Sequence, residues 1–555
     1  MAMPRPQMPP YDIDEWQKRP FPERLRMVCQ AWALQGYGTP AAIYVVYLLK
    51  IGLYIGGWLG VCALTPALGG PGTIAAWWSA PLAIQKAVLW SMLFEGLGLG
   101  CGSGPLTGRY FPPVGGILYF ARPGTTKMPL FPGLPLFGGD RRTWLDVVLY
   151  LAHVGFLVRA LVSATLPVEV LLPTVVLLPI LGVTDKTLFL SARAEHFYTA
   201  LICFLFPNDW LAGTRLVWVA VWLWAATSKL NAHFPSVVAV MQSNSPLTGF
   251  GSMRKALFRG YPDDLRPSRL AVFLAHAGTL VEYVFPLVLL ASPGGLPTKV
   301  ALITMLGFHV FITSSIPMGV PLEWNVIMVY GAFALFGGGA GFDSVRVSSP
   351  VVIAALMIAC FLLPLLGNLF PSRFSFLTSM RYYAGNWAYS VWLFRGRASS
   401  KLDACLVKSA PRVQDQLARF YDARTTTGLL SKVIAFRAMH LHGRALQLLL
   451  PKAVDDIDEY EWLDGELVAG VVIGWNFGEG HLHNAQLLRA LQRQCQFAEG
   501  DVRCIFVESQ PMGRPTMSWT IADAATGVRE TGTVKVTDLE ALQPWPVNED
   551  GSDQA

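Results

Sequence analysis

Long apolar windows constrain the fold of this chain more than any other feature. A transmembrane helix needs about 17–25 mainly apolar residues. Windows of that length occupy 41–64, 73–98, 143–165, 168–184, 214–231, 269–292, 298–317 and 351–370, and two shorter ones, 194–207 and 324–337, could be tilted or re-entrant. Only 14% of the 555 residues are charged, against about 25% in soluble proteins. The sequence therefore predicts an all-α polytopic membrane bundle of about ten transmembrane helices.

Basic residues gather in alternate loops, and this pattern predicts the orientation. They occur before the first window and in the loops near 109–142, 186–193 and 254–269, whereas the intervening loops contain only Arg346. Cytoplasmic loops carry the excess of Lys and Arg in membrane proteins. We therefore expect a multi-pass protein of the inner (plasma) membrane with both termini in the cytoplasm. The net charge of +6 is explained by this topology, so no nucleic-acid partner is expected.

The composition changes after Pro371, where the apolar windows end. Residues 372–395 are aromatic and basic without an acidic residue, which favours an amphipathic segment in the membrane interface. Later patterns predict helices over 412–450 and about 481–496, and strands over 467–474, 502–508 and 516–523. The expected parts are a cytoplasmic N-terminal segment, a transmembrane domain, an interfacial segment, a cytoplasmic α+β domain and a disordered tail, over 1–40, 41–370, 371–411, 412–545 and 546–555.

The cysteines and histidines indicate neither a disulfide framework nor a metal site. The eight cysteines show no CxxC spacing, and we expect them to remain reduced. The pairs His440/His442 and His481/His483 would share a face on a strand but point apart on a helix, and both pairs lie near predicted helices. Because no cysteine or carboxylate completes a ligand set, no metal is expected. The glycine-rich run 474–484 could bind an anion where a helix begins, although a tight turn is the simpler interpretation.

Four residues in or beside the apolar windows are the candidate catalytic residues, namely Lys229, His233, Glu282 and His309. An ionisable residue at membrane depth is costly unless it is paired or hydrated, and it usually has a function. On one helix, Lys229 and His233 would share a face, where desolvation beside an imidazole would help Lys229 act as a general base. Glu282 is the natural counter-charge for Lys229. The alternative is a lysine that reaches the cytoplasmic headgroups.

The run AATSKLNAHFPSVVAVM, 225–241, resembles the lysine signature of the HTTM and vitamin-K-dependent γ-carboxylase superfamily. The segments HAGTLVEYVFPLVLL, 276–290, and FHVFITSSIPMGVPLEWNVIM, 308–328, are similar to two further blocks of it, so the resemblance covers about residues 140–370. The whole chain also resembles an uncharacterised family of actinobacterial transmembrane proteins. The superfamily resemblance implies that Lys229 is the base that deprotonates a reduced quinone, with His309 as a polar partner. Ser228 stands where the superfamily has a second lysine.

Two functions follow from these patterns. The first is an HTTM-like enzyme that encloses a polar intramembrane site and acts on a lipidic or quinone-linked substrate; the cofactor is unknown, an isoprenoid quinone being the one that the resemblance implies. The second is a non-catalytic lipid-handling or transport component, or a membrane scaffold that docks a cytoplasmic protein partner through 412–545. Membrane lipids are partners in both. Clustered polar residues favour the first function, and polar residues along a path open to both faces favour the second.

Overall fold

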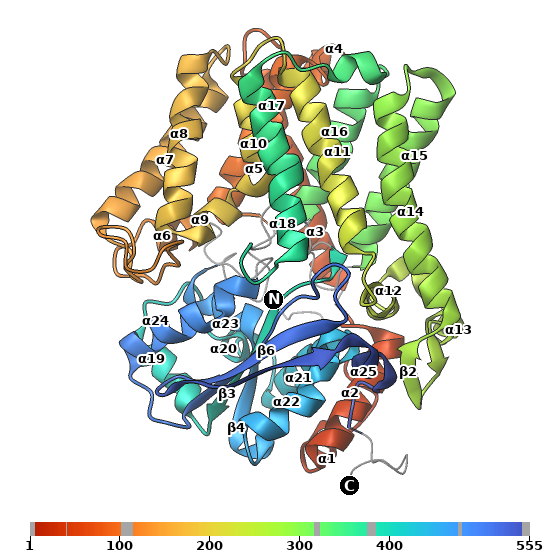
Figure 1. Cartoon of the computed structure of the whole chain (residues 1–555), viewed down its shortest axis with the longest axis vertical. Coiled ribbons are helices and arrows are strands. Elements are labelled where there is room, and N and C mark those ends of the chain that lie inside the picture. Colours follow the sequence, from red (N-terminus) through yellow and green to blue (C-terminus); the bar gives the residue numbers. More distant parts are fainter. Residues whose placement is uncertain are drawn as a thin grey trace.

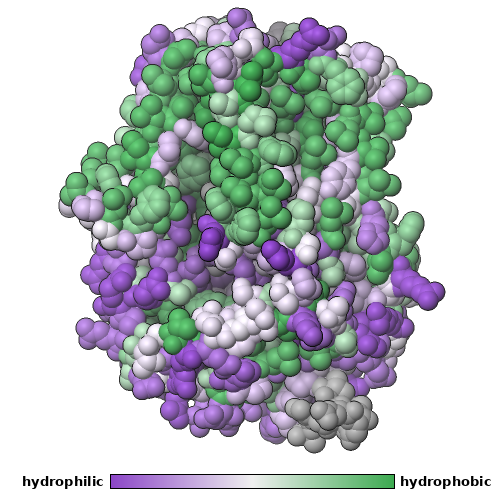
Figure 2. All heavy atoms as spheres, viewed as in Figure 1, coloured by the Kyte–Doolittle hydropathy of each residue, from purple (hydrophilic) through white to green (hydrophobic). Residues whose placement is uncertain are grey.

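The molecule divides into an apolar helical region and a region that contains a β-sheet. The computed structural model describes residues 6–39, 41–100, 115–315, 322–374, 384–474 and 480–546. Helices fill the upper part of Figure 1, and the sheet lies below them. On the face drawn in Figure 2, hydrophobic residues cover the upper part and hydrophilic residues gather on the lower part. We call the two parts the membrane region and the C-terminal region.

Five helical segments are long and apolar enough to cross a membrane. They are α3 (Ala41–Ala63), α7 (Trp144–Val162), α14 (Arg269–Ala291), α15 (Gly295–Ser315) and the segment Pro350–Leu369. The last segment consists of α17 (Pro350–Met357), a π-helical turn (Ile358–Leu362) and α18 (Leu363–Leu369). Large apolar side chains are exposed along these helices, including Leu49, Phe273 and Phe361, as expected for surfaces that face lipid.

The other predicted windows form helices that are shorter or less apolar, so the count of about ten spans is not confirmed. They are α5 (Pro81–Gly96), α8 (Val168–Thr184), α10 (Ala194–Phe204), α11 (Trp210–Ser228) and α16 (Leu322–Phe336). Window 73–98 is divided because a new helix begins at Pro81. Several of these helices pack inside the bundle, where neighbouring helices satisfy polar side chains that lipid could not.

The C-terminal region contains an antiparallel sheet with the strand order β4-β3-β5-β6-β7. The strands are β3 (Tyr389–Arg395), β4 (Tyr460–Asp464), β5 (Val502–Val507), β6 (Thr516–Asp523) and β7 (Gly527–Lys535). The predicted strands 502–508 and 516–523 are confirmed, and the helix predicted over 481–496 is α24 (Ala485–Cys495). The predicted strand 467–474 is wrong. The residues form a helix there, α23 (Gly465–Val472), which Asp464 caps. The prediction failed because a short apolar run fits a buried helix as well as a strand.

Strand β3 corrects the prediction of an amphipathic interfacial segment over 372–395. Its side chains alternate between two hydrophobic cores, Trp392 and Phe394 on one face of the sheet and Tyr389, Val391 and Leu393 on the other. A strand buried on both faces has no polar face to display. Its aromatic composition therefore reflects burial and not membrane contact. The part of the predicted segment at 375–383 lies outside the described residues.

The N-terminal helices α1 (Ile13–Gln17) and α2 (Phe21–Gln35) belong spatially to the C-terminal region. Trp32 and other apolar residues of α2 pack against α21 (Ala423–Met439). The Lys432 ammonium of α21 donates to the carbonyls of Gln7 and Tyr37 at 2.6 and 2.9 Å. The two ends of the chain thus build one unit beneath the membrane region (Figure 1).

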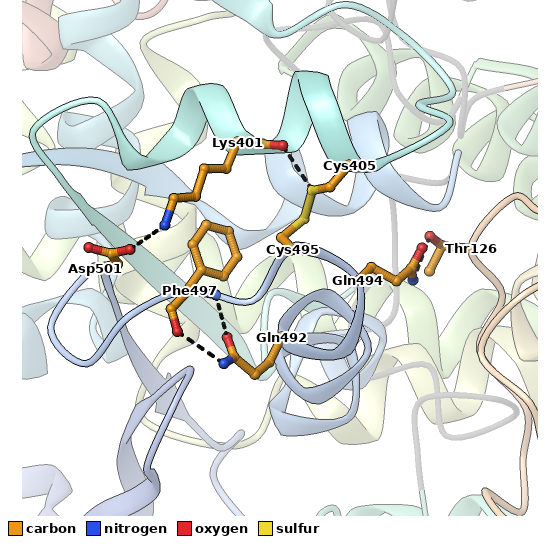
Figure 3. Close-up of a disulfide and its surroundings, with 8 residues drawn as sticks. All are labelled: Thr126, Lys401, Cys405, Gln492, Gln494, Cys495, Phe497 and Asp501. Atoms are coloured by element: carbon orange, nitrogen blue, oxygen red, sulfur yellow. Dashed lines mark hydrogen bonds and ion pairs between the residues drawn. A yellow bond between two sulfur atoms is a disulfide. The ribbon is translucent and has the colours of Figure 1, made fainter.

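A disulfide corrects the prediction that the cysteines remain reduced. It joins Cys405, at the end of α19 (Lys401–Cys405), to Cys495, at the end of α24, with a Cα–Cα distance of 5.3 Å. Figure 3 shows the bond between the two helix ends, beside the Lys401–Asp501 ion pair. The two cysteines are 90 residues apart, so their pairing depends on the fold and leaves no local spacing signal.

Candidate functional site

The first feature of the site is the place where α11 ends. Ser228 is its last residue and Lys229 is the C-cap, and α12 (Phe234–Gln242) begins only after His233, its N-cap. Lys229 and His233 therefore do not share a helical face, and that prediction is wrong. The chain forms a turn between the two residues. A cation at the C-cap is favourable, because the carbonyl end of a helix carries partial negative charge.

Lys229 forms a buried ion pair with Glu282 of α14. The two residues are only 7% and 4% exposed, so the expected counter-charge is confirmed. Glu282 lies 13 residues along the 23-residue helix α14 from Arg269, or about 20 Å at 1.5 Å per residue. The pair therefore lies near the middle of α14, one of the helices that are long and apolar enough to cross a membrane.

Two aromatic rings line the ammonium of Lys229. Its Nζ lies 5.2 Å from the ring centroid of Phe234 and 5.5 Å from that of Phe308. A cation within about 6 Å of an aromatic face is attracted by the ring quadrupole. The two rings cover the ammonium of Lys229 and carry no charge of their own. Glu282 is the acceptor in the one ion pair that Lys229 forms among the described residues.

His309 of α15 follows Phe308, one of the two aromatic residues whose rings contact the Lys229 ammonium. Its Nδ1 donates to Asn325 Oδ1 at 2.8 Å, and its Nε2 accepts from the indole of Trp222 at 3.1 Å. Both nitrogens are therefore engaged, and the ring is held in one orientation and one neutral tautomer. The His309 ring is thus a fixed polar group on α15.

His233 faces the C-terminal region instead of Lys229. Its Nε2 donates to the carbonyl of Ala384 at 3.0 Å, and its ring centroid is 5.6 Å from that of His442. Burial holds the pKa of His442 well below its ordinary value, and burial also lowers the pKa of nearby His440 to about 3. The three imidazoles are neutral under ordinary conditions. Their place in the structure is the contact between the two regions.

The loop between β5 and β6 contacts both the turn that follows Lys229 and helix α18. The carbonyl of Gln510 accepts from Asn231, two residues after Lys229, at 3.1 Å. The amide of Met512 donates to the carbonyl of Asn368 in α18 at 2.8 Å, and Asn368 Oδ1 accepts from Ser228 at 2.9 Å. The turn that contains Lys229 is thus fixed by both regions.

A second cluster of buried charged residues, here called the α10 cluster, lies elsewhere in the membrane region. Lys50 Nζ is 2.6 Å from Glu323 Oε1, and Arg193 is 3.4 Å from Glu95 and 3.8 Å from Glu195. His196 follows Glu195, and Trp324 contacts the rings of both His196 and His309. Sequence analysis missed Glu323. Glu323 could have been identified from the sequence, because it is an acidic residue directly before Trp324 and Asn325, at the start of an apolar window.

No group of three or more His, Cys, Asp or Glu side chains is arranged to hold a metal ion in the part of the chain that the structure describes. This includes the two His-x-His pairs. His442 bonds Asn386, His481 bonds Glu508, and His483 bonds Ser390. These histidines therefore form hydrogen bonds inside the C-terminal region.

Apolar helices around buried ion pairs, with a sheet-containing region at one end, define an integral membrane protein. The chain belongs to the family described as transmembrane protein of unknown function (DUF3556), whose model matches residues 1–554. A comparison with curated proteins gives no match, and neither does a comparison with solved structures.

Proposed function

We propose that this protein is an intramembrane enzyme in which Lys229 exchanges a proton with a lipidic or quinone-linked substrate. One observation carries the proposal, namely the Lys229–Glu282 pair buried within the apolar length of α14. Ionisable residues at membrane depth are costly and mark functional sites by default. The resemblance of residues 225–241 to the HTTM signature supports the same role, with an isoprenoid quinone as the cofactor or substrate class.

The pair holds one mobile proton. As an ion pair the proton sits on the Lys229 amine, and after transfer to Glu282 both groups are neutral. A low-dielectric site favours neutral groups, so a substrate that displaces water would find an uncharged amine able to accept its proton. His309, fixed by Asn325 and Trp222, then offers an oriented neighbour for the substrate's polar end.

The orientation and the count of spans belong to the same proposal. The alternate basic loops support a cytoplasmic C-terminal region, and in this proposal α5, α8, α10, α11 and α16 complete a bundle of about ten helices around the site. The membrane is the inner (plasma) membrane. The C-terminal region then serves as the cytoplasmic cover of the site and offers its surface to a protein partner.

A second candidate function is lipid handling without catalysis. The observation that favours it is the break between α11 and α12 beside a buried charge, because discontinuous helices form binding sites in transporters. The two candidates differ in whether the bound molecule is changed. The first predicts a chemical product, and the second predicts the same molecule before and after binding.

The test compares lipid and quinone extracts from cells that express the wild-type protein, Lys229→Ala or Lys229→Arg. If Lys229 is the base, mass spectrometry should find a substrate that accumulates in both variants and a product confined to the wild type. Membrane expression should be similar in all three. Identical extracts together with an unmodified lipid retained by all three purified proteins would contradict catalysis and favour the second candidate.

A further inference from the structure

The segment that precedes α14 forms a folded element at the start of that helix. We call it the hairpin element, and it consists of α13 (Gly251–Ala256) with its N-cap Phe250, β1 (Phe258–Gly260) and β2 (Asp264–Pro267). The two strands pair antiparallel, and Figure 1 shows α13 beside the lower end of α14. Leu257, Phe258 and Leu265 share a hydrophobic core with residues of α2 and α21. The inner side of the element is therefore fixed to the C-terminal region.

Arg254 holds α13 in place from the inside. Its guanidinium donates to the carbonyls of Thr248 and Ser245 at 2.9 and 3.1 Å, and to the carbonyl of Leu34 in α2. A side chain that satisfies backbone carbonyls in this way supports the fold. By contrast, Met253 and Lys255 of the same short helix are exposed.

Exposed apolar side chains continue from α14 onto the hairpin element. Phe273, one turn into α14, is 65% exposed, and Phe250 is 75% exposed. Leu270 and Met253 are exposed as well. Helix α14 is long and apolar enough to cross a membrane, so its exposed side chains meet lipid close to the hairpin element. Large apolar residues in such a position enter the boundary between headgroups and acyl chains.

Hydrogen bonds bring two cations together at the start of α14. Ser268, the N-cap of α14, donates from its amide to the carbonyl of Leu257 at 2.9 Å and from its hydroxyl to the carbonyl of Ala256 at 2.6 Å. Lys255 is next to Ala256 in the chain, and Arg269 is next to Ser268. Both cations are exposed, and they lie at the same end of the helix.

Arg259 of β1 is a third cation at this end. Its Nε donates to the carbonyl of Pro267, directly before Ser268, at 3.3 Å. The residue is exposed, as Lys255 and Arg269 are. The three residues thus form one group of exposed cations next to exposed apolar side chains.

The acidic residues of this segment do not cancel that charge. Between 246 and 270, five residues are Lys or Arg and two are Asp. Asp263 pairs with Arg26 of α2 at 2.7 Å, and Asp264 pairs with Arg266. Each carboxylate is already matched by a guanidinium, so the surface of the hairpin element is cationic.

We propose that the hairpin element is an interfacial anchor that binds the headgroups of anionic phospholipids. Phe250 and Met253 enter the acyl boundary, while Lys255, Arg259 and Arg269 meet the phosphate groups. Basic residues close to an anionic leaflet are attracted to it, and apolar residues beside them add buried area. A soluble anion would neutralise the cations but leave the apolar side chains in water.

This proposal goes beyond the acid–base role of Lys229 and does not depend on it. In the orientation proposed above, this end of α14 faces the cytoplasmic leaflet, where anionic lipids produce a negative surface potential. The anchor would hold the start of α14, and with it the helix that carries Glu282, at a fixed depth. Loss of Lys229 should leave the anchor intact.

The test measures hydrogen exchange of the amides of 250–259 by mass spectrometry, with the full chain in nanodiscs. Nanodiscs of phosphatidylcholine alone are compared with nanodiscs that also contain phosphatidylglycerol. We expect phosphatidylglycerol to slow the exchange several-fold, and we expect the difference to vanish in 1 M NaCl, where the Debye length is about 3 Å. Equal exchange in the two kinds of nanodisc at low salt would overturn the proposal.

Two soluble probes separate the lipid from other anions. Inorganic phosphate and polyglutamate are added, one at a time, to the full chain in phosphatidylcholine nanodiscs. Neither should slow the exchange of 250–259 as much as phosphatidylglycerol does. Equal protection by phosphate would assign the cations to a soluble anion, and equal protection by polyglutamate would assign them to an acidic protein. Either result would overturn the lipid assignment.

The cationic residues are tested with a matched control. Lys255→Gln/Arg259→Gln/Arg269→Gln should lose the effect of phosphatidylglycerol. The control removes the same charge from three exposed positions of the C-terminal region and should keep the effect; it is Arg419→Gln/Arg529→Gln/Lys535→Gln. Unchanged exchange of β6 shows that each protein is folded. Full protection of the first variant would contradict the role of the cations.

The apolar residues are tested separately. Phe250→Ser/Met253→Ser should exchange faster than the wild type in phosphatidylcholine alone, because the apolar contact is lost and the cations remain. Exchange equal to that of the wild type would contradict insertion of these side chains. Lys229→Met should respond to phosphatidylglycerol as the wild type does, so failure of the anchor is distinguishable from failure of the proposed enzyme function.

Discussion

Two buried lysines of the membrane region have opposite surroundings. Lys86 of α5 donates to Thr65 Oγ1 and to the carbonyls of Leu161 and Ser163 at 2.5, 2.7 and 2.8 Å, so its three protons are used. Lys229 faces a carboxylate and two aromatic rings. Carbonyl oxygens cannot take a proton, whereas Glu282 can. Lys86 is therefore a structural tie between helices, and Lys229 belongs to a pair that can move a proton.

The largest expected effect is on stability at Lys86. Lys86→Met should leave two buried oxygens and one part-buried oxygen without their donor, at about 1–3 kcal/mol each, and should lower the free energy of unfolding by about 4–6 kcal/mol. Denaturation of the purified protein, followed by tryptophan fluorescence, would measure this loss. A change below about 1 kcal/mol, the net value of a single hydrogen bond, would break the contrast with Lys229.

Lys229→Met should destabilise less, because Glu282 can respond by taking up a proton. Removing one partner of a buried pair costs about 3–5 kcal/mol, and protonation of Glu282 would reduce that cost. The same unfolding measurement applies. The added substitution Glu282→Leu should restore stability, since replacing a whole buried pair by apolar residues is often neutral. If the free energy of unfolding of Lys229→Met/Glu282→Leu were no higher than that of Lys229→Met, the ion pair would be structural.

Reduction of the Cys405–Cys495 disulfide extends the comparison to the two regions. A bond that closes a 90-residue separation should contribute about 2–4 kcal/mol to the region that contains it. Dithiothreitol should therefore weaken the C-terminal region and leave the Lys229 pair unchanged. Hydrogen exchange of β5 and α14 would separate the two. Equal loosening of both would contradict separate sources of stability.

The most gradual effect, at most about 1.4 kcal/mol per pH unit for each histidine, concerns pH at the contact between the regions. Burial lowers the pKa of His440 to about 3 and holds that of His442 well below its ordinary value. The unfolded chain protonates both below about pH 6.5, so stability should be constant above that pH. It should fall as the pH decreases, by up to about 1.4 kcal/mol per unit for each histidine. Unfolding curves from pH 7 to 5 test this, and His440→Phe should reduce the slope. An unchanged slope would contradict burial of a neutral His440.

The apolar windows predicted the membrane region, and the pairing of Lys229 with Glu282 could be anticipated because each is a rare charge among apolar residues. The position of Lys229 just after the end of α11 could not be predicted, since hydropathy alone does not show where that helix ends. Strand β3 was misread because a strand between two cores and an interfacial segment have similar aromatic composition. The partners of His233 and the Cys405–Cys495 bond depend on contacts distant in sequence.

The central claim is that the Lys229–Glu282 pair is functional and not structural. The most direct measurement compares Lys229→Met/Glu282→Leu with Lys50→Met/Glu323→Leu, which removes the other buried Lys–Glu pair. Each purified protein is tested for its unfolding midpoint and for the lipid or quinone conversion that the comparison of wild-type and Lys229-variant extracts is expected to identify. We predict that both variants remain folded and that only the Lys229 variant loses conversion. Full conversion by a folded Lys229→Met/Glu282→Leu protein would contradict the claim.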